Sequence, residues 1–169
     1  MCIRDSYDSA DRLSAAVDPR LNRTSYAYDG QGRVARMTAA DGGVTRYAYD
    51  DVGNLTQVTD PLNRTTRYVY DERDRLTQVT DPANNTTSYS YDDNDRVVTR
   101  TDPTNRTWSY TYEFDRLASE TAPDGGITEY TYDGAGRVNT LTDPLNRTTS
   151  YAYDGAHRRT AVTLSLIHI

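Results

Sequence analysis

The chain has 169 residues and a formal net charge of -6, and its length would allow a single domain. Leu, Ile, Val and Phe are sparse while Asp, Thr, Arg, Asn and Gly abound, a composition that by itself would favour disorder. All nineteen basic residues are arginines, interleaved with acidic residues, which argues against the continuous basic stripe of a nucleic-acid-binding protein. No apolar run is long enough to span a membrane.

The two ends of the chain, MCIRDS and LSLIHI, do not resemble the rest. Back-translated, they give DNA strings that are reverse complements over their shared length and that look like the transposase end used in sequencing libraries. We therefore expect residues 1–6 and 164–169 to be sequencing-adapter sequence read through at both ends of one DNA fragment. The alternative is a natural start and stop of unusual composition. The first segment is too short and too polar for a signal peptide.

Cys2 and His168 lie in these end segments. Residues 7–163 then contain no cysteine and one histidine, His157. The sequence therefore predicts neither a disulfide nor a Cys/His metal site.

Residues 7–163 repeat one unit with a period of twenty-one residues, seen best in the segment 59–79, TDPLNRTTRYVYDERDRLTQV. The fifteen tyrosines are Tyr7 and seven pairs spaced Tyr-x-Tyr, and one step is shortened to twenty residues. The recurring motif residues are Tyr26, Tyr28, Asp29, Arg33, Tyr47, Tyr49, Asp50, Tyr68, Tyr70, Asp71, Arg75, Tyr89, Tyr91, Asp92, Arg96, Tyr110, Tyr112, Tyr130, Tyr132, Asp133, Arg137, Tyr151, Tyr153 and Asp154. Asn54 occupies the arginine position once, and Arg116 comes one residue early.

Each unit predicts two β-strands and no helix. The first strand is Thr-x-Tyr-x-Tyr, as in residues 66–70, where alternation places both tyrosines on one face. The second is Arg-Leu-x-x-Val-Thr, as in residues 75–80, where Leu76 and Val79 have opposite parity. Either a bulge resets the face or both faces of this strand are partly covered.

The turn that begins at Asp60-Pro61 joins one unit to the next and favours a type I turn followed by a left-handed residue. Its third bend residue is read as Asn or Gly in every copy, and both residue types tolerate positive φ. The residues assigned to this position are Asn22, Gly42, Asn63, Asn84, Asn105, Gly125 and Asn146.

The second turn runs from the Asp after the tyrosine pair to the Arg, and its penultimate residue is also expected in the left-handed region. The residues at this position are Asp11, Gly32, Gly53, Asp74, Asp95, Asp115, Gly136 and His157. A turn role accounts for His157, and no nucleophile recurs near it. The segment 113–115 lacks one residue, which predicts a tighter turn there.

The expected fold class is therefore all-β, with tandem antiparallel β-hairpins of about 21 residues per repeat in an extended or spiralling sheet. Single hairpins are marginal in water, so neighbouring units must stack, with tyrosines one period apart in ladders. Both ends of such an array stay open, which favours fraying or aggregation.

The pattern Tyr-Asp-x-x-x-Arg-Leu followed by Thr-Asp-Pro-x-Asn resembles the YD repeat of Rhs proteins. Related repeats occur in insecticidal toxin-complex shell proteins, wall-associated toxins and teneurins, and the match covers nearly all of residues 7–163. The resemblance implies a hollow β-shell, which in bacterial members typically encloses a toxic C-terminal domain, and a secreted or cell-surface location. Neither the toxin domain nor the self-cleaving core segment of the family is found in this sequence, so the resemblance assigns no catalytic residue.

The leading interpretation is a structural section of such a shell, with adjoining repeats and a toxin domain of the parent chain as partners. The alternative is a surface adhesion or carbohydrate-binding module, in which rows of Tyr, Arg and Asp contact carbohydrate or a receptor. Tyrosines packed between neighbouring units would favour structure, and tyrosines open to solvent would favour a ligand.

Neither an enzyme nor a metal or cofactor site is expected. Acid–base chemistry needs two carboxyls in different environments, which repeated surface turns do not supply. The segment 92–95, Asp-Asp-Asn-Asp, has the ligand types of calcium but the wrong spacing, and is predicted to be an Asx-type turn. Trp108 replaces a strand Thr in one copy only; it either packs between neighbours or faces a shell interior, and packing is favoured.

Overall fold

The computed structural model describes residues 4–165, which contain sixteen β-strands and no helix. Of the expected adapter segments, residues 1–3 and 166–169, with Cys2 and His168, lie outside the described residues, whereas Arg4 begins the first strand. The contacts divide the chain into two units, Met1–Thr87 and Ser88–Ile169, and each is described by itself.

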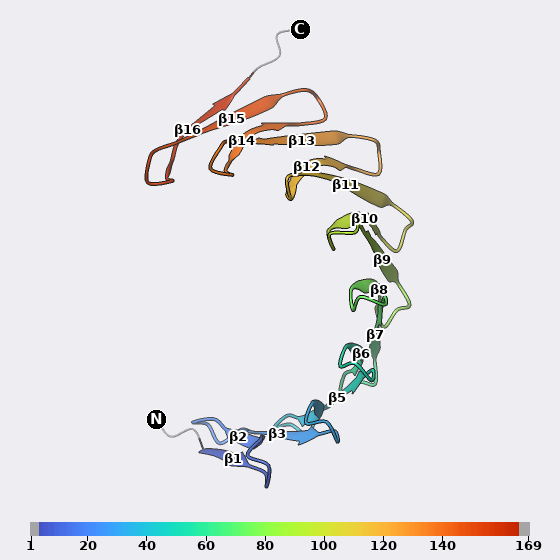
Figure 1. Cartoon of the computed structure of the whole chain (residues 1–169). Coiled ribbons are helices and arrows are strands. Elements are labelled where there is room, and N and C mark those ends of the chain that lie inside the picture. Colours follow the sequence, from blue (N-terminus) through green and yellow to red (C-terminus); the bar gives the residue numbers. More distant parts are fainter. Residues whose placement is uncertain (1–3, 166–169) are drawn as a thin grey trace. The chain divides into compact units, whose positions relative to one another are not determined.

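The first unit holds eight complete strands and the start of a ninth. These are β1 (Arg4–Tyr7), β2 (Leu13–Val17), β3 (Arg23–Tyr28), β4 (Val34–Thr38), β5 (Val44–Tyr49), β6 (Leu55–Thr59), β7 (Thr65–Tyr70), β8 (Leu76–Thr80) and β9 (Thr86–Tyr91). From β1 to β8, each strand pairs antiparallel with its neighbours in the sequence (Figure 1).

The second unit continues the same arrangement from the end of β9. Its strands are β10 (Val97–Thr101), β11 (Thr107–Glu113), β12 (Arg116–Thr121), β13 (Ile127–Tyr132), β14 (Val138–Thr142), β15 (Thr148–Tyr153) and β16 (Arg159–Leu164). Every pairing is antiparallel and joins strands that follow one another in the sequence. The predicted fold class, tandem antiparallel hairpins of an all-β chain forming an open sheet, is confirmed.

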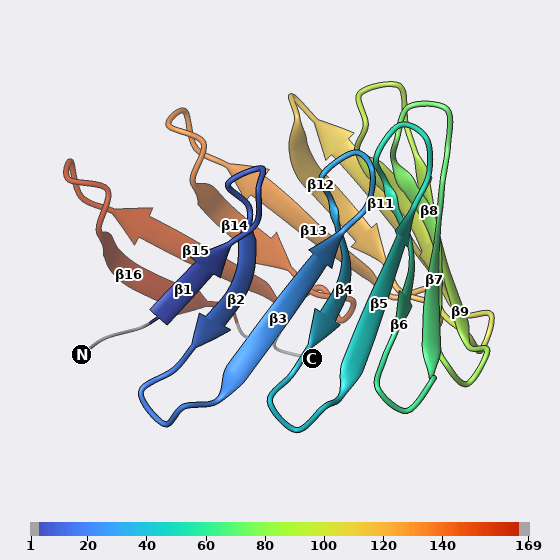
Figure 2. The same cartoon turned by 90° about the horizontal axis from the view of Figure 1, so that it is seen from below.

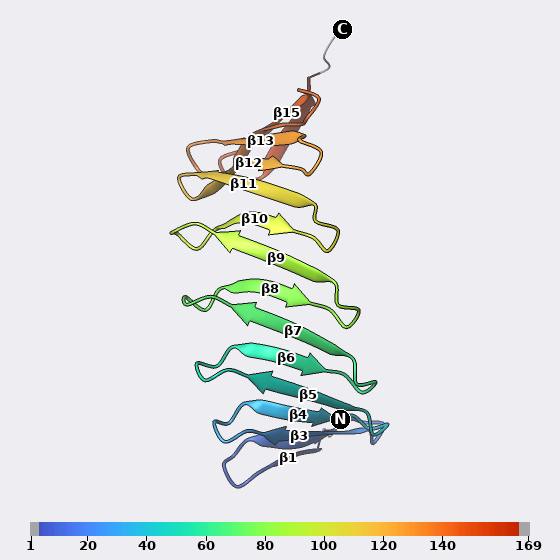
Figure 3. The same cartoon turned by 90° about the vertical axis from the view of Figure 1, so that its right-hand side faces the viewer.

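Two kinds of turn alternate along the chain. We call the turn after a tyrosine pair, such as 29–33, a YD turn, and the turn that leads into the next unit, such as 60–64, a DP turn. Since β3 to β8 lie side by side and alternate in direction (Figure 2), their YD turns lie along one edge of the sheet and their DP turns along the other (Figure 3).

Both kinds of turn are closed by the same hydrogen bonds. In the YD turn, the backbone N–H of Asp29 donates to the carbonyl of Arg33 (2.9 Å), and that of Gly32 donates to the carbonyl of Asp29 (3.1 Å). Gly32 has a φ of 83°, in the left-handed region that glycine enters at little cost. Positive φ is found at Gly42, Asn63, Asn84, Asn105, Gly125 and Asn146 in the DP turns, and at Asp11, Gly53, Asp74, Asp95, Asp115, Gly136 and His157 in the remaining YD turns.

In the first DP turn, the residue with positive φ is not the one expected from the sequence. The left-handed residue is Leu21, with a φ of 65°, and not Asn22. The backbone N–H of Leu21 donates to the carbonyl of Asp18 (2.9 Å), so the turn counts from Asp18 and places Asn22 one position later. There the side-chain amide of Asn22 donates to the Asp18 carboxylate (2.9 Å).

A β-bulge resolves the parity of the second strand. In the β7–β8 hairpin, Tyr70 lies opposite Leu76 and Tyr68 lies opposite Val79, which leaves Thr77 as the extra residue. The bulge therefore returns Leu76 and Val79 to the face that carries the tyrosines. The same shift in register recurs in all eight hairpins that close on a YD turn in the described chain.

The sheet has two different faces. Tyrosines and most Leu and Val side chains line one face, which we call the tyrosine face, whereas Thr, Ser, Gln and Arg predominate on the other, which we call the polar face. Among residues 4–165 only Ala15 and Asp102 are buried, with 1% and 7% of their surface exposed. The apolar side chains thus form a half-buried layer in place of a closed core.

The shortened YD turn is tighter than the others, as predicted. Strands β11 and β12 stay paired up to Glu113 and Arg116, so only Phe114 and Asp115 remain in the turn. Their φ values are 47° and 62°, and two consecutive left-handed residues are typical of a two-residue hairpin turn of type I′.

Replacing Leu21 by Asn should stabilise the chain. Leu21 is 82% exposed and has a positive φ that its β-carbon disfavours by about 1 kcal/mol, whereas Asn adopts this region more readily. We expect the melting temperature of Leu21→Asn to rise by about 2–4 °C, measured by circular dichroism. The control is Leu62→Asn, an exposed DP-turn leucine that lacks a positive φ and should leave the melting temperature unchanged; an equal rise in both variants would contradict the explanation.

Candidate functional site: the contact between neighbouring repeats

In six tyrosine pairs, the hydroxyl of the second tyrosine bonds to the repeat before it. The hydroxyl of Tyr49 donates to the carbonyl of Val34 (3.0 Å), at the start of β4. The paired residues of β4 and β5 run only from Arg36 to Thr38, so this carbonyl lies beyond the ladder and the phenol supplies its hydrogen bond. The same bond, at 2.8–3.1 Å, joins Tyr28 to Leu13, Tyr70 to Leu55, Tyr112 to Val97, Tyr132 to Leu117 and Tyr153 to Val138.

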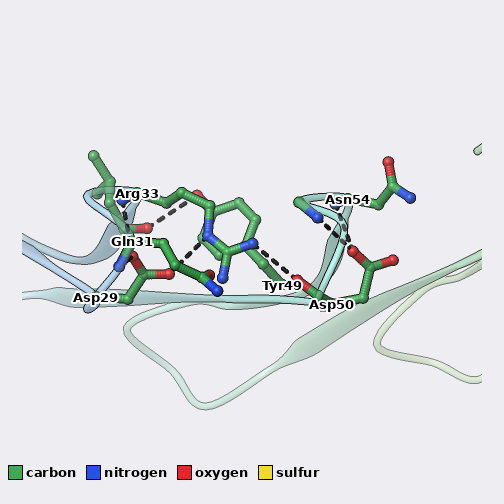
Figure 4. Close-up of polar contacts among 8 residues, drawn as sticks. Asp29, Gln31, Arg33, Tyr49, Asp50 and Asn54 are labelled. Atoms are coloured by element: carbon green, nitrogen blue, oxygen red, sulfur yellow. Dashed lines mark hydrogen bonds and ion pairs between the residues drawn. The ribbon is translucent and has the colours of Figure 1, made fainter.

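The arginine of the YD turn contacts two units at once (Figure 4). Within its own turn, Arg33 donates from Nε to the carboxylate of Asp29 (2.7 Å). Towards the next unit, it donates from Nη1 to the backbone carbonyl of Asp50 (2.9 Å). The same guanidinium stacks on the ring of Tyr49, with its central carbon 4.6 Å from the ring centroid. A single side chain therefore links the Asp of one unit to the Tyr-Asp of the next.

This arrangement recurs along the chain, both before and after residue 87. Arginines stack on the following tyrosine in the pairs Arg12–Tyr28, Arg96–Tyr112, Arg116–Tyr132 and Arg137–Tyr153, at 4.5–5.5 Å. Ion pairs within the turn join Asp8 to Arg12, Asp71 to Arg75, Asp92 to Arg96, Asp133 to Arg137 and Asp154 to Arg158, at 2.7–2.8 Å. The second tyrosine of these pairs therefore lies between neighbouring repeats, the placement that favours a structural role.

The YD-turn aspartate has three hydrogen-bond donors. Asp29 accepts bonds from the backbone N–H groups of Gln31 and Arg33 (both 2.9 Å) and from the Arg33 side chain. The backbone bond from Arg33, followed by its side-chain bond, holds the pKa of Asp29 below its ordinary value against the opposing effect of partial burial. In Asp71 and Asp133 the arginine side chain is the main cause of a lowered pKa.

Two of the tyrosines that bond to the preceding repeat have a pKa above its ordinary value. Burial raises the pKa of Tyr112, and the neighbouring Asp92 carboxylate raises it further. Burial likewise raises the pKa of Tyr70. A neutral phenol is the form that can donate to a backbone carbonyl, so the pKa shift and the hydrogen bond agree.

One unit departs from the pattern, because Asn54 stands in the arginine position. Its side-chain amide donates to the carboxylate of Asp74 in the next YD turn (2.7 Å), so the two units are linked by a polar contact and not by a stacked cation. A hollow of about 360 Å³ opens here, lined in part by Asn54, Tyr68 and Tyr70.

Trp108 lies in a cluster of its own on the tyrosine face. It is paired across the strands with Arg100, whose guanidinium carbon lies 4.8 Å from the ring centroid, and Arg106 lies at 5.7 Å. Arg106 in turn holds the buried carboxylate of Asp102 (2.6 Å). Trp108 thus packs against two arginines.

The remaining candidates for chemistry are turn residues. Asp92 accepts hydrogen bonds from the backbone of Asn94 (2.9 Å) and from Arg96, which makes the segment 92–95 the predicted Asx-type turn. His157 is an exposed turn residue with a φ of 62°. Within residues 4–165, no group of three or more His, Cys, Asp or Glu side chains is placed to hold a metal ion. No helix in that range could cross a membrane.

Two features of the contact escaped the sequence analysis. The motif marked Asp29, Arg33 and Tyr49 as repeat positions but assigned the arginine no contact with the tyrosine sixteen residues later. The constant separation of arginine and following tyrosine was the available signal. Threonine pairs across the DP turns, such as Thr59 with Thr65 (3.3 Å), were also missed.

Restoring the arginine at position 54 should stabilise the first unit. In Asn54→Arg the new guanidinium can fill the hollow, stack on Tyr70 and bind Asp50, as Arg33 does with Tyr49 and Asp29. We expect the melting temperature to rise by about 2–4 °C. Asn54→Lys has the same charge without the planar fork and should gain less. If the two variants gained equally, stacking would not be the source.

Acid should weaken the contact. A carboxyl whose pKa is lower in the folded chain than its ordinary value of 3.8 stabilises the fold above that value, and this stabilisation is lost as the pH falls through the folded pKa. We expect the melting temperature to be steady from pH 7 to about 5 and to fall steeply below about 4. The double variant Asp29→Asn/Asp133→Asn should melt lower at neutral pH and respond less to acid. An unchanged melting temperature at pH 2.5 would contradict this role.

Solved structures show the same fold in much larger proteins. The chain superimposes on a "TcdB2-TccC3-Cdc42" crystal structure with a TM-score of 0.76 and 18% identity, covering 96% of this chain and 10% of that one. It also superimposes on the Tc holotoxin pore of Photorhabdus luminescens, with a TM-score of 0.71 and 18% identity over 88% of this chain and 9% of that one. The chain thus spans about a tenth of the length of these proteins.

No curated protein sequence matches the chain. The family model for the teneurin YD-shell, in contrast, matches residues 2–167, nearly the whole length. The matched residues include every copy of the Tyr, Asp and Arg contact described above. The chain therefore belongs to the teneurin YD-shell family, as a structural repeat segment of such a shell.

Proposed function

We propose that the chain is a section of the wall of a bacterial, secreted or cell-surface Rhs-type toxin, and that the wall encloses or presents a toxic domain carried by the same parent chain. One observation carries this proposal. Where the arginine contact is present, it joins one repeat to the following repeat and always in the same direction, and the outer edges of β1 and β16 remain free of a further strand within residues 4–165. Because both edges are open, further repeats of the same kind can be added at either end of the array without limit.

Two further findings support a wall in preference to a binding module or an enzyme. The hydroxyl of the second tyrosine of a pair is engaged by a carbonyl of the preceding repeat, and its ring is covered by an arginine, so this tyrosine is not free to stack on a carbohydrate. Most of the aspartates that open the turns are held by an arginine or asparagine of their own turn, and this repeated environment does not supply two unlike carboxyls for acid–base chemistry. The structural neighbours belong to toxin complexes by name, which favours a toxic domain as the partner.

The parent gene tests both the wall and the origin of the chain ends. We propose that residues 1–6 and 164–169 are adapter sequence, so a single long read of the parent DNA should replace both segments by further copies of the repeat. It should also lead into a core segment and a variable tail. If MCIRDS and LSLIHI were encoded beside genomic start and stop signals, both the adapter origin and the wall of a larger toxin would be wrong.

Protease protection tests enclosure directly in the parent protein. We expect the tail of the intact protein to resist a protease that digests the same tail expressed alone. The double variant Arg33→Ala/Arg137→Ala removes two contacts between units and should speed cleavage of the tail by about tenfold or more. Arg20→Ala, an exposed DP-turn arginine, is the control and should leave the rate unchanged. Equal cleavage of the free and the intact tail would contradict enclosure.

A further inference from the structure

From β3 to β8, acidic side chains lie only in the turns. From β3 to β8, every charged strand residue is an arginine: Arg23, Arg36, Arg46 and Arg67. Every Asp and Glu of residues 23–80 lies in a turn. An even mixture of charges in the sequence therefore becomes a basic sheet face between two acidic edges.

Three of these arginines lie together on the polar face. Arg46 and Arg67 each precede the first tyrosine of a pair, and residues alternate in a strand, so both point away from the tyrosine face. Arg36 lies directly opposite Arg46 in the β4–β5 pair. Arg46 and Arg67 occupy the same repeat position two strands apart, which separates them by about 10 Å. We call these three residues the arginine stripe.

The arginine stripe has no counter-charge among the described residues. All three side chains are exposed, and no ion pair or hydrogen bond to their guanidinium groups is found within residues 4–165. The other arginines of β4 to β7 and their turns, Arg33 and Arg64, are each paired with an Asp. Like charges directly opposite in an antiparallel pair destabilise it, so the opposed Arg36 and Arg46 favour an anion that bridges them.

The surroundings of the stripe restrict the chemistry of that anion. The neighbours on the polar face are Gln57, Thr59 and Thr65, and the aromatic rings lie on the opposite face. Nucleic-acid bases and sugar rings bind through aromatic stacking, which this face does not offer. Carboxylates bind guanidinium groups through two parallel hydrogen bonds and need no ring.

The acidic turns limit the width of the ligand. Asp29, Asp50 and Asp71 lie along one edge of the face, and Asp41 and Asp60 along the other. A wide polyanion such as a nucleic-acid duplex would lie over these carboxylates and be repelled. A single extended chain running across the strands touches the stripe alone.

We propose that the polar face of β4–β7 binds an extended acidic polypeptide segment through Arg36, Arg46 and Arg67. One carboxylate bridges the opposed Arg36 and Arg46, and a second, three residues further along an extended chain, is about 10 Å away and reaches Arg67. The binding surface is separate from the contact between neighbouring repeats, which lies on the tyrosine face and at the YD edge.

Fluorescence anisotropy of a labelled deca-glutamate peptide with the full chain tests the proposal. At about 50 mM salt, where charges are only partly screened, we expect saturable binding. The double variant Arg36→Gln/Arg46→Gln should weaken it by about tenfold or more. This variant removes a repulsive pair, so it should melt no lower than the parent.

The double variant Arg20→Gln/Arg23→Gln is the matched control, since it makes the same change in net charge near the DP edge. It should alter the dissociation constant by less than about twofold. An equal loss in both variants, or no binding by the parent, would overturn the proposal. Tighter binding of a single-stranded oligonucleotide or a heparin fragment of equal charge would also overturn it.

Discussion

The structure depends on one arginine side chain in most repeats, which contacts both its own repeat and the next one. The guanidinium of Arg33 is fixed by Asp29 in its own turn and covers Tyr49 in the next. A planar guanidinium can form the ion pair at its edge and the stack on its face at the same time, which an ammonium cannot. Because the contact always points towards the following unit, repetition of the sequence produces repetition of the fold.

The rest of the hairpin serves to place this contact. The bulge after each YD turn returns Leu and Val to the tyrosine face, where they surround the rings. It also leaves the first carbonyl of the second strand outside the ladder with the next unit, where the following tyrosine hydroxyl satisfies it. Two positions of left-handed backbone per unit close the turns at a length that keeps the register.

A sheet built in this way has little interior, and its stability is a sum of nearest-neighbour contacts. A repeat that departs from the motif is therefore tolerated, because its effect is confined to its own contacts. Asn54 substitutes a polar link and leaves a hollow, while Trp108 and Arg100 replace a smaller pair with a stacked one. The two-residue turn at Phe114 and Asp115 shortens one hairpin, yet Tyr132 still bonds to Leu117 across the next boundary. Each change stays within one boundary between repeats because, in residues 4–165, strands contact only the strands next to them in the sequence.

The sequence by itself determined the period, the strands, the turn positions and the open array, because each follows from local alternation and from residues that accept positive φ. It misplaced the left-handed residue at Leu21, because the neighbouring Asn22 looked like the better turn residue. Only the tertiary structure decided that a bulge resets the face and that Arg33 stacks on Tyr49. These depend on register between strands, and register is fixed by pairing with a neighbour and not by the local pattern.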